Sequence, residues 1–123
     1  MAHILVVDDS ATDQYVFKKV LEQSGHQVTV ANNGKEGVAL AKRLSPDLIL
    51  MDVVMPVLNG FQATRELSRT EETRNIPVVM VTTKDAETDI LWAQRQGAKA
   101  YIIKPAQEQQ LLGCVGKFVG VGR

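Results

Sequence analysis

The chain has 123 residues, of which 45% are hydrophobic and 23% are charged, and its formal net charge is zero. We therefore expect one globular domain over residues 1–123, with a frayed tail at 120–123. The lack of a basic excess argues against nucleic acid binding, and no apolar run is long enough to cross a bilayer. The single cysteine, Cys114, cannot form an internal disulfide, and no secretory signal is visible, so we expect a cytoplasmic protein without membrane insertion.

The first segments alternate between a short apolar run and an amphipathic stretch. Residues 4–7 are too short for a helix and rich in β-branched side chains, which predicts a buried strand. Ser10, with Asp13 three positions later, is typical of a helix start with a capping box, and Gly25 ends that helix. The predicted buried face of this helix consists of Val16, Phe17, Val20 and Leu21.

The hydrophobic pattern of the next segment, residues 27–31, is weaker. Gln27–Ala31 alternates apolar and polar residues, which favours a less buried strand at an edge of the sheet. Asn33 and Gly34 are predicted to turn the chain toward a second helix, which Ser45 and Pro46 close.

The rest of the chain repeats the alternation three more times. Gly113 and Gly116 fall inside the last predicted helix and weaken it by about 1 kcal/mol each. The predicted strands lie at 48–51, 78–81 and 100–103, and the predicted helices at 61–67, 85–96 and 107–119.

Five strand-then-helix units predict an open parallel sheet with helices on both faces. In such sheets, ligands bind beyond the carboxyl ends of the strands, at the point where the strand order reverses. The residues that follow four of the predicted strands are therefore candidates for a functional site.

The residues that follow these four strands are polar, and they comprise three acids, a threonine and a lysine. Asp8 and Asp9 follow the first strand, Asp52 the third, Thr82 the fourth and Lys104 the fifth. Like charges about 4 Å apart cost roughly 4 kcal/mol per pair at an effective dielectric constant of about 20. Three carboxylates at one edge therefore need a cation or a shared proton. We predict a metal site that leaves one carboxylate available for chemistry.

In this order, the residues resemble those of a response-regulator receiver domain of the CheY type, and the resemblance covers the whole chain. It implies a flavodoxin-like (CheY-like) α/β fold with five parallel strands in the order 2-1-3-4-5 and helices on both faces. Residues 60–65 and 82–85, together with Trp92 and residues 95–97, are similar to the single-domain receivers of type IV pilus (twitching-motility) chemosensory systems. The motifs that carry the wider resemblance are Asp8-Asp9-Ser10, Asp52 with Met55-Pro56 and Asn59-Gly60, Thr82, Gly97-Ala98 and Lys104-Pro105.

The resemblance also implies a role for each residue at the predicted edge. Asp52 is expected to accept a phosphoryl group from a phosphohistidine. Asp9 and Asp52 are expected to hold Mg²⁺ directly, with Asp8 acting through water and the Val54 carbonyl completing the protein ligands. Lys104 is expected to pair with Asp52 before transfer and with the phosphoryl oxygens afterwards.

A conformational switch is implied as well. Thr82 is expected to hydrogen-bond the phosphoryl group, which lets Tyr101 swing inward and sends the signal out through the fourth helix, fifth strand and fifth helix. We also expect a cis peptide bond between Lys104 and Pro105. Ala106 stands where many receivers carry phenylalanine, so the output face differs from that of better-known relatives.

The expected partners are a CheA-like histidine kinase as phosphodonor and a separate output protein, and the chain itself is expected to be monomeric. It is not expected to be an enzyme beyond self-phosphotransfer and autodephosphorylation. A phosphate sink or shuttle without an output of its own remains an alternative.

Two alternatives come from other classes of protein. A flavodoxin-like electron carrier would share the fold, but Asp8 and Asp9 occupy the place of its phosphate loop and would repel a flavin phosphate. A haloacid-dehalogenase-type phosphatase would carry two aspartates separated by one residue after the first strand, which residues 8–11 do not supply.

Overall fold

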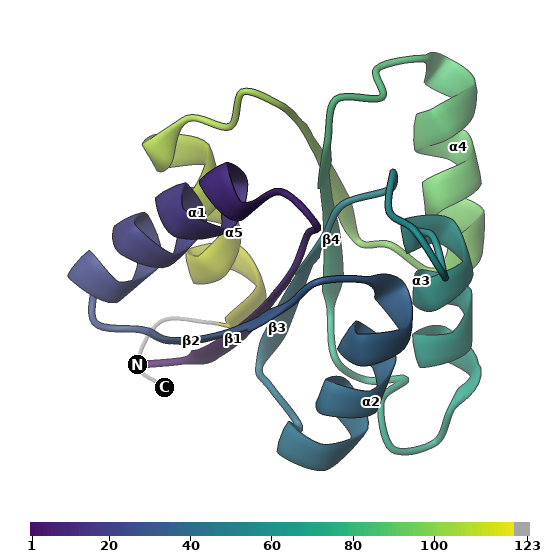
Figure 1. Cartoon of the computed structure of the whole chain (residues 1–123), viewed down its shortest axis with the longest axis horizontal. Coiled ribbons are helices and arrows are strands. Elements are labelled where there is room, and N and C mark those ends of the chain that lie inside the picture. Colours follow the sequence, from purple (N-terminus) through teal and green to yellow (C-terminus); the bar gives the residue numbers. More distant parts are fainter. Residues whose placement is uncertain (120–123) are drawn as a thin grey trace.

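The computed structural model describes residues 1–119, so the predicted frayed tail at 120–123 lies outside the described residues. A five-stranded parallel sheet runs through the middle of the molecule in the order β2-β1-β3-β4-β5, as predicted (Figure 1). Its strands are β1 (His3–Val7), β2 (Gln27–Ala31), β3 (Leu48–Met51), β4 (Val78–Thr82) and β5 (Ala100–Ile103).

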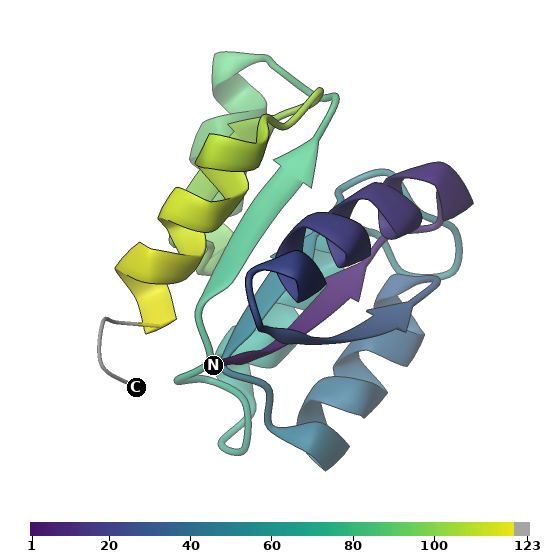
Figure 2. The ribbon, with the colours of Figure 1, turned by 90° about the vertical axis from the view of Figure 1, so that its left-hand side faces the viewer.

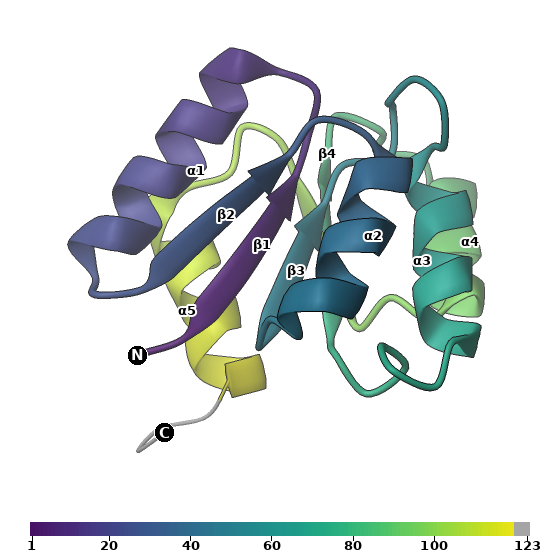
Figure 3. The same cartoon turned by 60° about the horizontal axis from the view of Figure 1, so that its bottom comes forward.

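Helices cover both faces of the sheet (Figures 1 and 3). Two of them, α1 (Ala11–Gln23) and α5 (Glu108–Val119), lie side by side on one face (Figure 2). The other three pack against the opposite face, and they are α2 (Gly34–Leu44), α3 (Gly60–Arg69) and α4 (Glu87–Gln96).

The alternation of side chains along the strands divides the interior into two cores. On β1, Leu5 and Val7 belong to the core under α2, α3 and α4, while Ile4 and Val6 belong to the core under α1 and α5. All four are almost fully buried, because a strand in the middle of a doubly covered sheet has no solvent face. In contrast, β2 has a fully buried residue only at Ala31, which confirms the predicted edge strand.

The apolar face of α1 is narrower than predicted. Phe17 and Leu21 are buried, but Val16 is 42% exposed and Val20 is only partly buried. Only a narrow stripe of α1 is covered, because this helix lies over the β2 edge of the sheet and contacts α5 on one side only. The prediction for Val16 was therefore wrong.

The third helix begins at Gly60, one residue before its predicted range, whereas the starts of the fourth and fifth helices move later by one or two residues. The fourth helix begins at Glu87 rather than at residue 85, because Ala86 is the extended N-cap residue and forms no side-chain cap. The fifth begins at Glu108, and the backbone N–H of Gln107 donates to the side chain of Gln110. Shifts of this size are usual where no strong cap defines the first turn.

Only one of the two hydrogen bonds of the predicted capping box forms at the start of α1. Ser10 Oγ accepts a hydrogen bond from the backbone N–H of Asp13, but the Ser10 N–H donates to Asp8 Oδ1 instead of to Asp13. A complete capping box occurs on α3, between Asn59 and Gln62. The carboxylate of Asp13 is therefore available for another contact.

Asn33 and Gly34 do not form a separate turn. Asn33 caps α2 by accepting from the N–H of Glu36, and Gly34 is the first residue of that helix. The predicted end of the same helix is confirmed, with Ser45 in the left-handed conformation at the C-cap. None of the described helices has both the length and the apolar character needed to cross a membrane.

Replacing Gly113 with alanine is expected to raise the free energy of unfolding by up to about 1 kcal/mol. Helix α5 continues through this position, and a Cβ placed there would meet no atom within 4 Å. The methyl group therefore restricts the unfolded chain without a clash in the folded one. Urea unfolding of the variant and the wild type measures the change. A lower midpoint in the variant would contradict the prediction.

Candidate functional site

The site lies where the strand order reverses. The chain passes from β1 to β2 on one side and from β3 to β4 and β5 on the other, so the carboxyl ends of β1 and β3 form the switch point. Asp8 and Asp52 follow these two strands directly, and backbone hydrogen bonds hold both. The Asp52 N–H donates to the Val7 carbonyl at 2.9 Å, and the Asp8 N–H donates to the Ala31 carbonyl at 3.0 Å.

Three carboxylates meet at this edge, as the sequence predicts. Asp8, Asp9 and Asp52 each offer a carboxylate oxygen, and these oxygens lie within 4.8 Å of one another. Asp8 is 1% exposed and Asp52 8% exposed, whereas Asp9 faces solvent. Among the described residues, no hydrogen bond or ion pair engages the Asp9 carboxylate. A donor set made entirely of oxygens, with one member open to water, fits Mg²⁺.

Lys104 reaches into the same cluster from the end of β5. Its backbone N–H donates to the Thr82 carbonyl at 2.8 Å, and its peptide bond to Pro105 is cis, as predicted. The Nζ atom lies 2.8 Å from Asp8 Oδ2 and 3.2 Å from Asp52 Oδ2. The lysine and the buried acids thus form one ion-paired group.

Burial and charge act in opposite directions on these residues. Burial raises the pKa of Asp8, and the hydrogen bonds from Lys104 and Ser10 offset this only in part, while the charge of Asp52 raises it further. For Lys104, burial alone would lower the pKa, but the hydrogen bonds to Asp13 and Asp8 and the charge of Asp52 raise it instead. The lysine is therefore firmly protonated, while burial disfavours the charged form of Asp8 more than its hydrogen bonds favour it.

The segment after β3 is held by two close backbone approaches. Asp52 Oδ1 accepts from the Val53 N–H at 2.7 Å, and the Val53 carbonyl accepts from Gly60 at 2.9 Å. A Cβ at Gly60 would lie 2.0 Å from the Asp52 carbonyl oxygen, so only glycine permits this approach of α3. On the other side, the Gly34 N–H donates to the Leu58 carbonyl at 3.1 Å. The loop between Asp52 and α3 is thus fixed at both ends.

Within that loop, two valines face solvent. Val54, whose carbonyl is a predicted metal ligand, and Val57 are both exposed. Val57 has φ at 72°, an outlier for a β-branched residue that the sequence did not reveal. A strained backbone conformation persists where the surrounding structure holds it in place. Here the hydrogen bonds of Gly60 and Gly34 hold the two ends of the loop.

The two predicted switch residues are linked through Lys84. Thr82 is completely buried at the end of β4, and its Oγ1 accepts from the Lys84 N–H at 3.4 Å. The Tyr101 hydroxyl, on β5, donates to the Lys84 carbonyl at 2.7 Å. Partial burial raises the pKa of Tyr101 to about 12, with further contributions from the charges of nearby acids. The Tyr101 hydroxyl therefore stays protonated, and its hydrogen bond to the Lys84 carbonyl holds the β4–α4 loop.

Two polar residues of α1 also touch the site, and sequence reasoning gave neither of them this role. Asp13 Oδ2 lies 2.6 Å from Lys104 Nζ, and Gln14 Nε2 donates both to the Asp8 carbonyl and to Asn32 Oδ1. The available signal was their position in the first turn of a helix that begins beside the acidic edge. The sequence pattern predicts only a capping role for Asp13.

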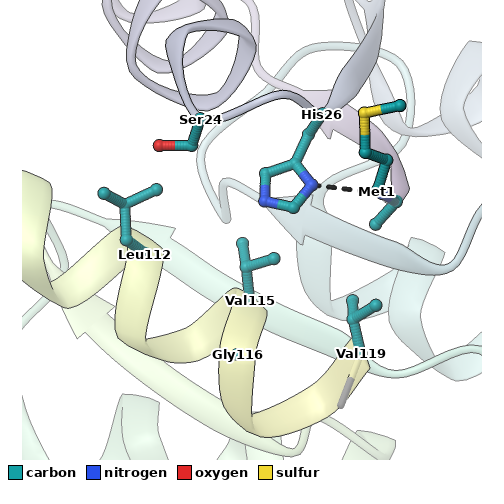
Figure 4. A pocket seen from close by; sticks show the side chains of 8 residues that line it. Met1, Ser24, His26, Leu112, Val115, Gly116 and Val119 are labelled. Carbon is teal, nitrogen blue, oxygen red and sulfur yellow. Dashed lines mark hydrogen bonds between the residues drawn. The ribbon is translucent and has the colours of Figure 1, made fainter. Parts of the chain in front are cut away.

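A separate pocket lies on the α1 and α5 face, away from the carboxylates (Figure 4). His26 stands on one side of it, where Nδ1 accepts from the Ala2 N–H at 3.1 Å, and apolar residues of α5 form the other side. None of the predicted site residues lines this pocket, so it does not belong to the acidic site. The residues that line it are Met1, Ala2, Ser24, His26, Leu112, Val115, Gly116 and Val119.

Comparison with known proteins identifies the class. The family model described as response regulator receiver domain matches residues 4–115, so the chain belongs to this family. This membership decides against the flavodoxin and phosphatase alternatives. Two curated relatives are similar over nearly their whole length. Protein PilH of Pseudomonas aeruginosa is 58% identical over 112 residues, which cover 91% of this chain and 93% of the relative. The polar-differentiation response regulator DivK of Brucella anthropi is 32% identical, with 95% of each chain covered.

Solved structures agree with this assignment. The receiver domain of a sensor histidine kinase from Pseudomonas aeruginosa has a TM-score of 0.90 and 32% identity, with 98% of each chain covered. In that structure a magnesium ion is coordinated in the active site cleft. A chemotaxis protein of Vibrio cholerae has a TM-score of 0.90 and 29% identity, with 96% of this chain and 98% of the other covered. The CheY-like fold predicted from the sequence is confirmed.

Proposed function

We propose that this response regulator accepts a phosphoryl group on Asp52 from the phosphohistidine of a histidine kinase, in a reaction that depends on Mg²⁺. The observation that carries the proposal is the convergence of Asp8, Asp9, Asp52 and Lys104 at the switch point of the sheet. Asp52 follows β3, a central strand, and its carboxylate faces both the other acids and the lysine. This arrangement places a nucleophile, a cation site and a phosphate-binding amine together.

The transfer needs few covalent changes. A carboxylate oxygen of Asp52 attacks phosphorus, the bond between phosphorus and the histidine nitrogen breaks, and the nitrogen keeps the electron pair and takes up a proton. Positioning and charge stabilisation dominate such loose transition states. When bound, Mg²⁺ supplies positive charge to the phosphoryl oxygens, and Asp9 and Asp52 would hold it directly. Asp8 would contribute through water, and the Val54 carbonyl would complete the protein ligands.

The remaining site residues would act on the phosphoryl group after transfer. Lys104 would exchange its contact with Asp52 for one with a phosphoryl oxygen, which keeps a buried ammonium paired. The Thr82 hydroxyl would donate a hydrogen bond to another phosphoryl oxygen. Beyond this self-phosphotransfer and the hydrolysis of the resulting acyl phosphate, which releases inorganic phosphate, we propose no enzymatic turnover.

Phosphorylation of the wild-type chain tests the proposal directly. Incubation with a small phosphodonor and Mg²⁺ is expected to add one phosphoryl group that is stable to acid and labile to base. Intact-protein mass spectrometry measures the addition, and a parallel sample with a metal chelator serves as the control. If no addition occurs with Mg²⁺, or if the chelator has no effect, the proposal is wrong.

The signal is proposed to pass from Thr82 to Tyr101. Replacing Thr82 with alanine is expected to leave phosphorylation of Asp52 intact but to weaken the coupled change at Tyr101. One charge-assisted hydrogen bond contributes about 1.5–3 kcal/mol, enough to turn a minor conformer of a few per cent into the major one. Nuclear magnetic resonance of the Tyr101 ring and the α4 amides, with and without the phosphoryl mimic beryllofluoride, measures the coupling. Identical shifts in variant and wild type would show that Thr82 is not the relay.

The output surface proposed for this signal is the face made by α4, β5 and α5. Leu91 and Trp92 on α4 and Ile103 on β5 are large apolar residues that stay well exposed on these two elements. An exposed apolar group of this kind favours binding of an output protein over a pure phosphate sink. Capture of partners with the unmodified chain and with the beryllofluoride complex separates the two, because a sink shows the same partners in both.

The pathway we propose is the chemosensory control of type IV pili, in the cytoplasm, with a CheA-like kinase as phosphodonor. Its support is the motif similarity of residues 60–65, 82–85, 92 and 95–97 together with the 58% identity to Protein PilH. Phosphotransfer from the isolated kinase of such a system to this chain, compared with transfer from an unrelated kinase, tests the assignment.

A further inference from the structure

The amine of Lys104 contacts a third carboxylate that the proposed mechanism does not use. Asp13 on α1 lies at 2.6 Å from Nζ, nearer than either Asp8 at 2.8 Å or Asp52 at 3.2 Å. We propose that Asp13 is a positioning residue that holds Lys104 back from the phosphoryl group and so lowers the affinity of the site for it. This inference rests on the proposed function, because it assigns Lys104 to the phosphoryl group.

The local structure leaves Asp13 free for this contact. In a full capping box, its carboxylate would accept from the N–H of Ser10, but that N–H donates to Asp8 at 2.8 Å. The backbone of Asp13 still takes part in the cap by donating to Ser10 Oγ. The helix start therefore fixes the backbone of Asp13 while its side chain bonds to Lys104.

Counting donors shows why the three acids compete with a phosphoryl group. A lysine ammonium has three N–H donors, and here each carboxylate accepts one hydrogen bond from Nζ. A phosphoryl oxygen can therefore gain a bond only if one carboxylate gives up its own. Asp52 becomes the acyl phosphate, and a second donor is freed only by the release of Asp8 or Asp13.

Burial decides which of these two acids is released more easily. The side chain of Asp13 is 35% exposed, so water can replace the lysine around its carboxylate. The side chain of Asp8 is 2% exposed, and an unpaired charge there would be strongly unfavourable. Asp13 is thus the residue that competes with the phosphoryl group for Lys104.

The negative charge of Asp13 also lowers the affinity of the site for a phosphoryl group. Asp8, Asp13 and Asp52 all pair with the ammonium of Lys104, and Asp9 lies beside two of these acids, so carboxylate charge exceeds the charge of that ammonium within the cluster. Another anion is repelled by this charge, whereas a divalent cation is attracted. Removing the charge of Asp13 is therefore expected to favour the phosphoryl group and to disfavour free Mg²⁺. These opposite signs distinguish a role in the site from a general loss of stability.

Binding of beryllofluoride at saturating Mg²⁺ tests the proposal on the whole chain. Asp13→Asn is expected to bind the mimic about tenfold more tightly than wild type, which corresponds to about 1.4 kcal/mol. Binding of Mg²⁺ without the mimic is expected to weaken by about twofold. Asp13→Glu, which restores the charge, is expected to reverse both changes. Glu22→Gln removes the same charge from an exposed position of α1 and is expected to change neither.

A double-mutant cycle shows whether Asp13 acts through the lysine. In a Lys104→Met background, the added Asp13→Asn change is expected to have less than half of its effect on beryllofluoride affinity. An equal effect in both backgrounds would overturn the proposal, since Asp13 would then act by its field alone. If Lys104→Met fails to fold by circular dichroism, Lys104→Gln takes its place, with the same two outcomes.

The possible failures are distinguishable. Wild type that does not bind beryllofluoride with Mg²⁺ would contradict the proposed function itself. Wild type that binds while Asp13→Asn binds equally or more weakly would overturn only the role of Asp13.

Discussion

Replacing Asp52 with asparagine is expected to reduce phosphoryl incorporation by at least about a hundredfold, because the amide has no nucleophilic carboxylate oxygen. The substitution keeps the size of a side chain that is 8% exposed and that accepts hydrogen bonds from Val53 and Lys104. The fold should therefore survive, and the loss should be chemical. Incorporation is measured by intact mass after treatment with a small phosphodonor and Mg²⁺.

The control for this variant is Glu22→Gln, which removes one exposed acid far from the switch point and should incorporate as much phosphoryl group as wild type. Peptide mapping locates any group that remains on the Asp52 variant. Full incorporation without a newly modified acid elsewhere would show that Asp52 is not the acceptor.

Replacing Gly60 with alanine is expected to lower the free energy of unfolding by about 3 kcal/mol. A Cβ there would meet the carbonyl oxygen of Asp52 at 2.0 Å, and backbone cannot move aside as a flexible side chain does. Relief of this clash must shift the start of α3 away from β3. The shift also moves Val53, whose N–H holds Asp52 Oδ1, so phosphorylation should fall in the fraction that remains folded.

Urea unfolding of the Gly60 variant measures the loss of stability, and the Gly113→Ala variant is its matched control. Both substitutions add one methyl group to a helix. At Gly60 the methyl group has no space, whereas at Gly113 it points into open space. Their effects are expected to have opposite signs. A Gly60 variant with an unchanged unfolding midpoint would contradict the close approach of α3.

Much of the fold was predictable because its signals are local. Short apolar runs bounded by polar residues identified every strand, and the weaker alternation of Gln27–Ala31 correctly indicated an edge. The error at Val16 has a tertiary cause, since the width of the buried stripe on α1 depends on how the helix sits over the sheet edge. The late start of the fourth helix reflects the missing side-chain cap at Ala86.

The candidate site was also predictable only in the parts that depend on local sequence signals. Asp8, Asp9, Asp52 and Lys104 were brought together correctly, because parallel strands place their carboxyl ends at one edge. The contact of Asp13 with Lys104 joins residues far apart in the chain, and which partner a long side chain selects depends on the packed helix. The positive φ of Val57 was equally hidden, since valine does not signal that conformation.

The lysine and the acids that it pairs with come from distant parts of the chain, and this has a consequence for biosynthesis. Lys104 is separated by 96 positions from Asp8 and by 52 from Asp52. A nascent chain on the ribosome that has not yet reached β5 carries the acids of β1 and β3 without their ammonium. The ion-paired cluster of Lys104 with Asp8 and Asp52 is therefore expected to form only after β5 has been synthesised.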